Sequence, residues 1–182
     1  MAPLVFLGGI YGSGKSTLCS RTASLLSAVH LKASDLAAHT TRGFADEGKA
    51  VDNIPANQER VLANLERHRG ATELILLDGH FCIYNRALEI EDVATTVFLR
   101  MRPDLLILVD VPPSVAWQRL QKREQAQFNV ERLTHLAERE RLNASRVAAL
   151  MNLSLEVLSA DAHAADCAAL VSSRIGNERV SR

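Results

Sequence analysis

The sequence predicts an α/β fold, a three-layer sandwich in which helices cover both faces of a five-stranded parallel sheet. Three observations support this prediction. A strand-like apolar run near the start leads directly into a glycine-rich loop and a helical pattern. Four further strand-like runs follow, and helical patterns separate them. Strands that alternate with helices are typical of parallel sheets, because a crossover is needed to bring the next strand back in the same direction.

The expected strands are short runs rich in Leu, Ile and Val, at residues 4–7, 28–31, 73–77, 105–109 and 153–158. The expected helices have apolar residues three and four apart, at residues 16–27, 34–39, 57–69, 91–99, 114–127, 130–151 and 162–175. The polar stretch 42–55 contains Gly43, Gly48 and Pro55 and predicts a loop. We expect this loop to lie over the carboxyl edge of the sheet, where open α/β sheets carry their ligand sites.

Length and charge limit the classes of protein that fit. Residues 1–182 are expected to form a single domain, because this length suits one hydrophobic core. Lys and Arg together number 21, as do Asp and Glu, so no global charge favours a nucleic acid or an anionic membrane. No apolar run is long enough to span a membrane and no signal-peptide pattern opens the chain, so we expect a cytoplasmic protein without a membrane partner. The three scattered cysteines are expected to be reduced.

Residues 9–16 match the pattern G-x-x-x-x-G-K-[ST], a loop whose backbone N–H groups cradle nucleotide phosphates. The strand before this loop and the helix after it are the context that the motif requires, since a helix N-terminus attracts anions. We expect Lys15 to be an exposed charge that reaches the β- and γ-phosphates of ATP, and Ser16 to ligate Mg²⁺. The residues expected to bind ATP here are Gly12, Ser13, Gly14, Lys15, Ser16 and Thr17. The alternative is a glycine-rich turn with a solvent-facing lysine.

Two acidic residues directly follow apolar strands. Asp78 ends the stretch "ELILLD", and a carboxylate at the carboxyl end of a core strand suits a second Mg²⁺ ligand. The alternative for Asp78 is a turn or helix cap, because Asp before Gly is also a turn signal. Asp110 stands in the same way after "LLILV", but two prolines follow closely, so we interpret Asp110 as a cap of the next helix. The predicted metal ligands are therefore Ser16 and Asp78.

Two arginines in the next predicted helix are candidates for contact with the phosphates. Arg119 and Arg123 are four residues apart and share one face of the helix. They form either a phosphate clamp or a solvated surface. The helix leaves the carboxyl edge of the sheet, which favours the clamp and a catalytic role for both residues. Residues around 117–132 are then a short lid-like segment.

Asp35 is a candidate catalytic residue on the acceptor side of the sheet, at the end of the second strand. A hydroxyl acceptor gains from a general base, whereas a phosphate acceptor is already ionised and needs none. The other interpretation is that Asp35 is the N-cap of the helix that follows, with Ser34 competing for that position. The sequence leaves the two interpretations open.

Several motifs together resemble the P-loop nucleoside and nucleotide kinases, and most closely the archaeal-type adenylate kinases and related small AAA-like ATP-binding proteins. They are the phosphate loop, "LLDGH" at the third strand, "RPDLLILVDVPP" at the fourth, and "RLQKR" in the next helix. The resemblance covers almost the whole chain and implies a P-loop NTPase sheet of order 2-3-1-4-5. It implies that Arg119 and Arg123 grip the migrating phosphoryl group and that Asp161 lies beside the adenine. The arginines that would hold an acceptor phosphate, Arg42 and Arg86, are displaced from the family pattern.

We therefore expect an ATP- and Mg²⁺-dependent phosphotransferase that is a monomer or a weak dimer and acts on a small acceptor, with a nucleoside monophosphate as the first choice. One alternative is a kinase of a hydroxyl acceptor, either a nucleoside or a polynucleotide 5′ end, that uses Asp35 as its base. A nucleic-acid end is not favoured, because His39, Arg42 and Lys49 make only a sparse basic track. The other alternative is an ATPase switch or assembly factor, since one fold serves many functions.

Overall fold

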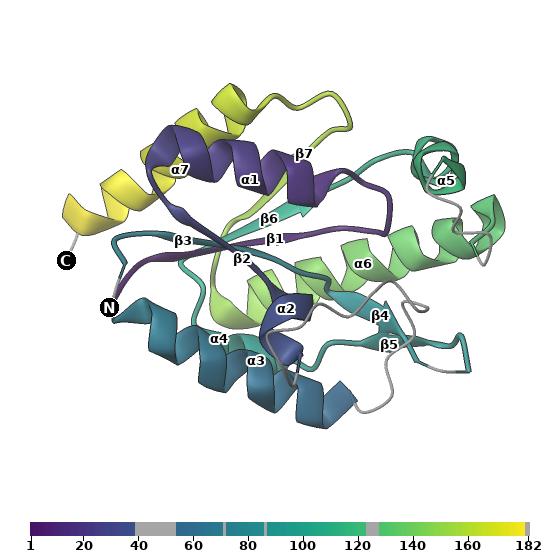
Figure 1. The fold of residues 1–182 in the computed structure, drawn as a ribbon, viewed down its shortest axis with the longest axis horizontal. Helices are drawn as coiled ribbons and strands as arrows, with labels where there is room; N and C mark the ends of the chain where they lie inside the picture. The colour runs from purple at the N-terminus through teal and green to yellow at the C-terminus, as the bar shows by residue number, and fades with distance from the viewer. Residues whose placement is uncertain (39–53, 71, 86, 123–127, 181–182) are drawn as a thin grey trace.

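A parallel sheet forms the middle layer of the computed structural model, which describes residues 1–38, 54–70, 72–85, 87–122 and 128–180 (Figure 1). Its five strands are β1 (Leu4–Gly8), β2 (Val29–Lys32), β3 (Ile75–Asp78), β6 (Leu105–Val109) and β7 (Leu155–Leu158). They lie in the order β2-β3-β1-β6-β7, and every neighbouring pair is parallel. Numbered within this sheet alone, the order is 2-3-1-4-5, so the predicted fold class and strand order are confirmed.

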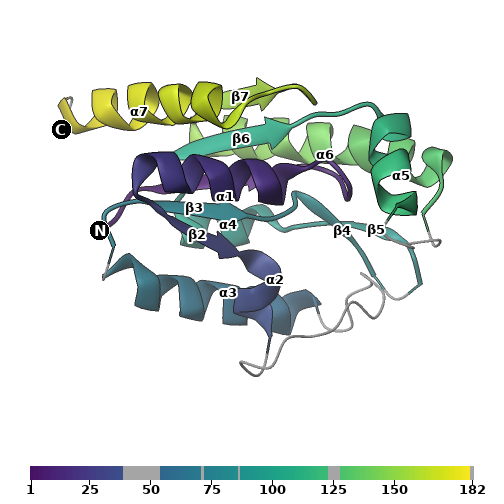
Figure 2. The same cartoon turned by 45° about the horizontal axis from the view of Figure 1, so that its top comes forward.

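Helices cover both faces of the sheet (Figure 1). One face packs against α1 (Lys15–Leu26) and α7 (Ala164–Val180), which lie side by side in Figure 2. The other face packs against α3 (Ile54–Arg69), α4 (Thr95–Met101) and the second half of α6 (Val130–Met151). The shorter helices α2 (Ala33–Ala37) and α5 (Pro113–Gln121) follow β2 and β6. The sheet is therefore covered by apolar contacts on both sides, as its continuous runs of Leu, Ile and Val predict.

Strand β1 supplies both cores, because successive side chains of a strand point to opposite faces. Val5 and Leu7 belong to the core beneath α1 and α7, and both are fully buried. Phe6 points to the other core, where its ring packs edge-on against Phe81 and Phe98 at centroid distances of 5.0 and 5.2 Å. The phosphate loop thus starts from the central strand of the sheet, which is anchored on both faces.

A two-stranded antiparallel hairpin after β3 corrects the sequence prediction. It consists of β4 (Cys82–Tyr84) and β5 (Ile90–Asp92), and it lies outside the main sheet. The predicted helix 91–99 is wrong over its first residues, because residues 90–92 pair with β4 and α4 begins only at Thr95. The residues of such a short strand alternate between polar and apolar over too few positions to be separated from a helical pattern.

Other boundaries differ by smaller amounts. Helix α3 begins at Ile54, before Pro55, which was assigned to the loop. Proline is tolerated in the first turn of a helix, where its missing N–H would have no intrahelical partner. Helix α5 ends at Gln121, earlier than predicted, and α6 covers the predicted residues 130–151. The rest of the predicted loop 42–55, from residue 42 to residue 53, lies outside the described residues.

Two further sequence predictions can be compared with the structure. Cys19, Cys82 and Cys167 are free, as expected, and all three are buried. Burial raises the pKa of each of these thiols, which keeps them in the unreactive protonated form. Among the helices that the structure describes, none is long and apolar enough to cross a membrane.

Candidate active site

The loop between β1 and α1 is held in a tight conformation that depends on its glycines, as Gly12 and Gly14 show. Gly12 and Gly14 have φ angles of 77° and 89°, in the left-handed region that side chains disfavour. A Cβ on Gly12 would lie 2.5 Å from the carbonyl oxygen of Ala116 in α5, so that helix packs directly on the loop. Gly14 is the N-cap of α1. The backbone N–H groups of the loop therefore lie next to the free N–H groups at the start of α1, an arrangement that binds phosphate.

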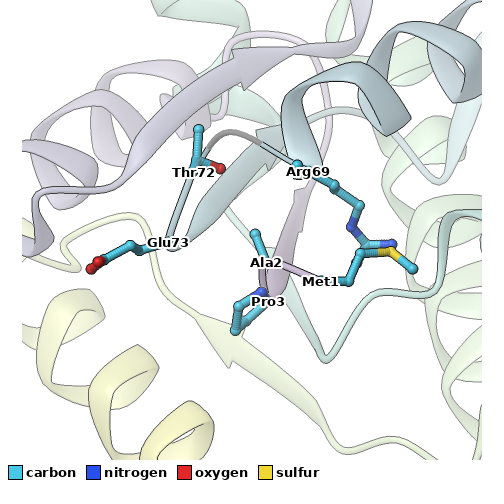
Figure 3. A pocket seen from close by; sticks show the side chains of 7 residues that line it. Met1, Ala2, Pro3, Arg69, Thr72 and Glu73 are labelled. Carbon is cyan, nitrogen blue, oxygen red and sulfur yellow. The ribbon is translucent and has the colours of Figure 1, made fainter.

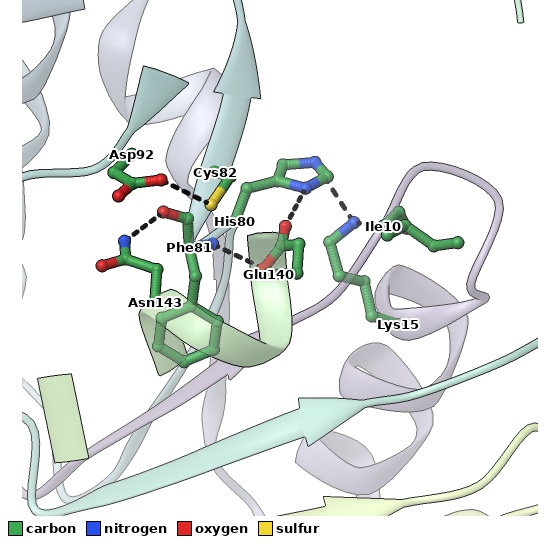
Figure 4. Close-up of polar contacts among 8 residues, drawn as sticks. All are labelled: Ile10, Lys15, His80, Phe81, Cys82, Asp92, Glu140 and Asn143. Carbon is green, nitrogen blue, oxygen red and sulfur yellow. Dashed lines mark hydrogen bonds and ion pairs between the residues drawn. The ribbon is translucent and has the colours of Figure 1, made fainter. Parts of the chain in front are cut away.

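Lys15 is buried in the loop, with only 7 % of its surface exposed, so the prediction of an exposed charge is wrong. Its ammonium donates to the carbonyl oxygen of Ile10 at 3.4 Å and lies 3.2 Å from Nε2 of His80 (Figure 4). Burial lowers the pKa of Lys15, and the negative charges of Asp78 and Glu140 act in the opposite direction. Both contacts are long for hydrogen bonds, so the ammonium is held in place without being locked there.

Three hydroxyl-bearing residues stand within two positions of the lysine in the sequence. Ser16 and Thr17 are exposed in the first turn of α1. The Oγ atom of Ser13 is buried and has no hydrogen-bond partner in the described part of the chain. A buried hydroxyl without a partner costs stability, and a phosphate oxygen would satisfy it.

Asp78 ends β3 beside the phosphate loop, in register with Leu7 of β1. Only 6 % of it is exposed, and its Oδ2 atom lies 3.9 Å from Nε2 of His30. A serine hydroxyl and a carboxylate are hard oxygen donors, and Mg²⁺ in nucleotide sites takes one or two such protein ligands and completes its shell with water and phosphate. Ser16 and Asp78 therefore fit Mg²⁺ by their chemistry. The residues that the structure describes contain no cluster of three or more His, Cys, Asp or Glu able to hold a metal.

Two residues of this region were missed by the sequence analysis as a functional pair, His80 and Glu140. Oε1 of Glu140 lies 3.2 Å from Nδ1 of His80, and its Oε2 accepts the N–H of Phe81 at 2.9 Å (Figure 4). Burial raises the pKa of Glu140 to about 8, although Lys15 and the N–H groups of Phe81 and Cys82 oppose this shift. The available signal was weak, since Glu140 only interrupts the apolar stripe of α6.

Arg119 contacts the phosphate loop from α5. Its Nη1 atom donates to the carbonyl oxygen of Ser13 at 2.8 Å and to that of Gly12 at 3.4 Å, and the residue is half-buried. Arg119 is thus not part of a solvated surface. Its predicted partner Arg123 lies outside the described residues, as does most of the segment between α5 and α6. The function of the pair stays a prediction.

Asp35 lies in the first turn of α2 and is exposed. The N-cap of α2 is Lys32, so the interpretation of Asp35 or Ser34 as the cap is wrong. The Ser34 hydroxyl instead donates to Oδ1 of Asp35 at 3.4 Å. The position of Asp35 after β2 is as predicted, and its function as a base stays a prediction.

The sequence also assigned functions to two other acidic residues, Asp110 and Asp161. Asp110 does not cap α5, whose N-cap is Pro112. Its carboxylate accepts two hydrogen bonds of 2.8 Å from Nε and Nη2 of Arg141 in α6, because a guanidinium matches a carboxylate with two parallel donors. Asp161 is exposed between β7 and α7, and its contact with adenine stays a prediction.

A hollow of about 510 Å³ lies away from the phosphate loop, at the edge of the sheet where β1 and β3 begin (Figure 3). It is lined by Met1, Ala2, Pro3, Arg69, Gly70, Thr72 and Glu73. The only buried charge here, Arg69, donates to the carbonyl oxygens of Met101 and Arg102 at 2.8 Å each. The guanidinium therefore fastens α3 to the end of α4, and we assign the hollow no ligand.

The sheet order, the phosphate loop and the acid at the end of β3 are together the features of a P-loop nucleotide-binding fold. The sequence model of the family described as "AAA domain" matches residues 8–137, and the chain belongs to this family. The match begins at the end of β1 and includes the phosphate loop, Asp78 and Arg119.

Two individual proteins are similar to this chain. A protein of Oryza sativa subsp. japonica named "Probable adenylate kinase 2, chloroplastic" is 33 % identical over an alignment of 129 residues, and the match covers 64 % of this chain and 41 % of that protein. The chain thus matches less than half of the length of this relative. The structure of shikimate kinase from Acinetobacter baumannii in complex with shikimate superposes with a TM-score of 0.62 at 18 % identity, and the match covers 97 % of this chain and 95 % of that one. This second likeness shows the fold.

Proposed function

We propose that this protein is an ATP-dependent phosphotransferase that transfers the γ-phosphoryl group of ATP to a small acceptor. The observation that carries the proposal is the buried Lys15 in a complete phosphate loop, with Asp78 at the end of the neighbouring strand. A buried cation needs a counter-charge, and the triphosphate supplies one when the loop N–H groups bind it. The names of both related proteins are those of kinases, which supports the same reaction class.

In the proposed reaction the chain positions charged groups rather than forming covalent bonds. The loop N–H groups bind the phosphates, and Lys15 offsets the charge on the β- and γ-phosphates. Arg119 already contacts the loop and would turn toward the migrating phosphoryl group, where charge is largest in the transition state. When bound at Ser16 and Asp78, Mg²⁺ would supply further charge neutralisation at the phosphates.

The first candidate for the acceptor is a nucleoside monophosphate. The adenylate kinase name of the rice relative and the motif resemblance both support it. The second candidate is a hydroxyl acceptor, and one observation favours it: Asp35 is exposed after β2 and is not used as a helix cap, so its carboxylate is available as a base.

An acceptor screen with γ-labelled ATP tests the proposal. The panel contains nucleosides, nucleoside monophosphates and 5′-hydroxyl oligonucleotides, and hydrolysis to free phosphate is measured in parallel. We expect one acceptor class to make transfer much faster than hydrolysis. Slow hydrolysis that no acceptor diverts would contradict the proposal and favour an ATPase switch. The class of acceptor that responds decides between the two candidates.

A further inference from the structure

Helix α6 carries two polar side chains in the middle of its buried face. Glu140 and Asn143 are each only 1 % exposed, while their neighbours on that face are apolar. A buried carboxylate is expensive unless its oxygen atoms find donors. Its presence in a helix that otherwise packs on the sheet therefore calls for a specific set of partners.

The partners of Glu140 belong to the turn that follows Asp78. Each Glu140 oxygen has one, Nδ1 of His80 at 3.2 Å and the N–H of Phe81 at 2.9 Å. One turn further along α6, Asn143 donates to the carbonyl oxygens of Phe81 at 2.7 Å and Val93 at 3.1 Å (Figure 4). Both side chains thus bind the backbone of Phe81, but only Glu140 reaches the imidazole that faces the lysine.

The donors and acceptors of Lys15, His80 and Glu140 together fix which ring nitrogen of His80 carries the proton. A charged Lys15 has donors only, so Nε2 of His80 must be the acceptor of the 3.2 Å contact. A neutral imidazole then carries its proton on Nδ1, which faces Oε1 of Glu140. The carboxylate accepts at Nδ1 and thus stabilises the same tautomer that the lysine requires at Nε2. The ring of Tyr11 packs on this imidazole at a centroid distance of 4.4 Å and limits its rotation.

We propose that Glu140 is a positioning residue of the phosphate site, which fixes the tautomer and orientation of His80 and through it holds Lys15 where phosphates bind. This inference rests on the proposed function of the loop. Asp78 faces the lysine from β3, and Cys82 lies near the carboxylate from β4. Because the contacts of Lys15 with His80 and Ile10 are 3.2 and 3.4 Å long, the ammonium can exchange them for phosphate oxygens.

The first test is spectroscopic and does not depend on activity. The ¹⁵N signals of the His80 imidazole are measured in the nucleotide-free protein near pH 8.5, with a His80→Gln variant to assign them. We expect the Nδ1–H tautomer in the natural protein. In Glu140→Gln the amide oxygen can keep the N–H of Phe81, which turns the amide NH2 toward Nδ1 and opposes a proton there, so we expect the share of the Nδ1–H tautomer to fall. An unchanged tautomer in the folded variant would show that Lys15 alone sets it and would overturn the role of Glu140. An Nε2–H tautomer in the natural protein overturns the inference even if the variant does not fold.

The second test measures ATP binding, with Asn143→Ala as the matched control. Both Glu140→Gln and Asn143→Ala disturb the turn after Asp78, but only the first disturbs His80. We expect Glu140→Gln to weaken ATP binding roughly 10–100-fold, the factor for a lost hydrogen bond to a charged group, and Asn143→Ala to change it less than about 3-fold. Combined with His80→Gln, the Glu140→Gln change should add little, since both act through one imidazole.

The outcomes separate this inference from the proposed function. Equal ATP affinity in the natural protein and in Glu140→Gln would overturn the positioning role and leave the proposed function standing. Failure of the natural protein to bind ATP would contradict the proposed function, while the tautomer measurement would still decide whether Glu140 orients His80.

Discussion

Arg119 gives the sharpest prediction about transfer, because its guanidinium already lies against the phosphate loop. The Arg119→Ala change removes a 2.8 Å hydrogen bond to the carbonyl of Ser13 and a weaker one of 3.4 Å to Gly12. Hydrogen bonds from a charged donor contribute about 1.5–3 kcal/mol when buried. Because Arg119 is only half-buried and the second bond is long, we expect the free energy of unfolding to fall by about 1–2 kcal/mol.

The effect on the reaction should be larger than the effect on stability. An arginine that stabilises the migrating phosphoryl group acts mainly in the transition state, so kcat should fall roughly 10²–10³-fold while ATP affinity falls much less. Arg119→Lys keeps the charge but loses the planar pair of donors, so it should recover only part of the rate.

The assay is steady-state transfer from γ-labelled ATP, with ATP affinity measured separately by calorimetry and folding checked by thermal unfolding. An Arg119→Ala protein that loses ATP affinity and rate by the same factor would show that the arginine only supports the loop. A variant with an unchanged rate would refute the reasoning altogether.

Three further changes probe other parts of the account. Asp35→Asn should lower the rate roughly 10²–10⁴-fold if the acceptor is a hydroxyl and change it little if the acceptor is a monophosphate, as initial rates with each acceptor will show. Gly12→Ala places a Cβ 2.5 Å from the carbonyl oxygen of Ala116 at a φ of 77°, so chemical denaturation should show that the free energy of unfolding falls by roughly 2–4 kcal/mol. The control Gly176→Ala, in an exposed part of a helix, should raise it by about 0.5–1 kcal/mol. Burial raises the pKa of Glu140 to about 8, so the folded state binds this proton more tightly than the unfolded state does. The free energy of unfolding should therefore fall as pH rises from 5 to 8. Denaturation curves taken across this range should show a smaller fall for Glu140→Gln.

The parts of the fold that local patterns encode were predicted well. The motif of residues 9–16 joins the end of β1 to the first turn of α1 as expected, and α6 begins and ends at the predicted residues. Asn129 explains the start of α6, since its side chain accepts the N–H of Arg132 at 2.8 Å, the usual N-cap contact. Strong apolar periodicity and a capping residue are both readable from neighbouring positions in the chain.

The contacts that the sequence analysis missed join residues far apart in the chain. Glu140 meets His80 across 60 positions, and Arg141 meets Asp110 across 31. Asp110 has the sequence context of a cap, and only the packing of α6 beside β6 brings a better partner to it. The burial of Lys15 was missed for the same reason, because His80 and Glu140 enclose it from elements that no local pattern connects to the loop.

The central claim is that the buried Lys15 serves phosphoryl transfer from ATP. The most direct measurement compares transfer of labelled phosphate by the natural protein and by Lys15→Met, which keeps the length of the buried stem and removes the charge. We predict that the natural protein transfers phosphate to one acceptor class much faster than it hydrolyses ATP, and that Lys15→Met lowers this rate roughly 10²–10³-fold with an unchanged circular dichroism spectrum. A folded Lys15→Met protein that transfers phosphate at nearly the natural rate would contradict the claim.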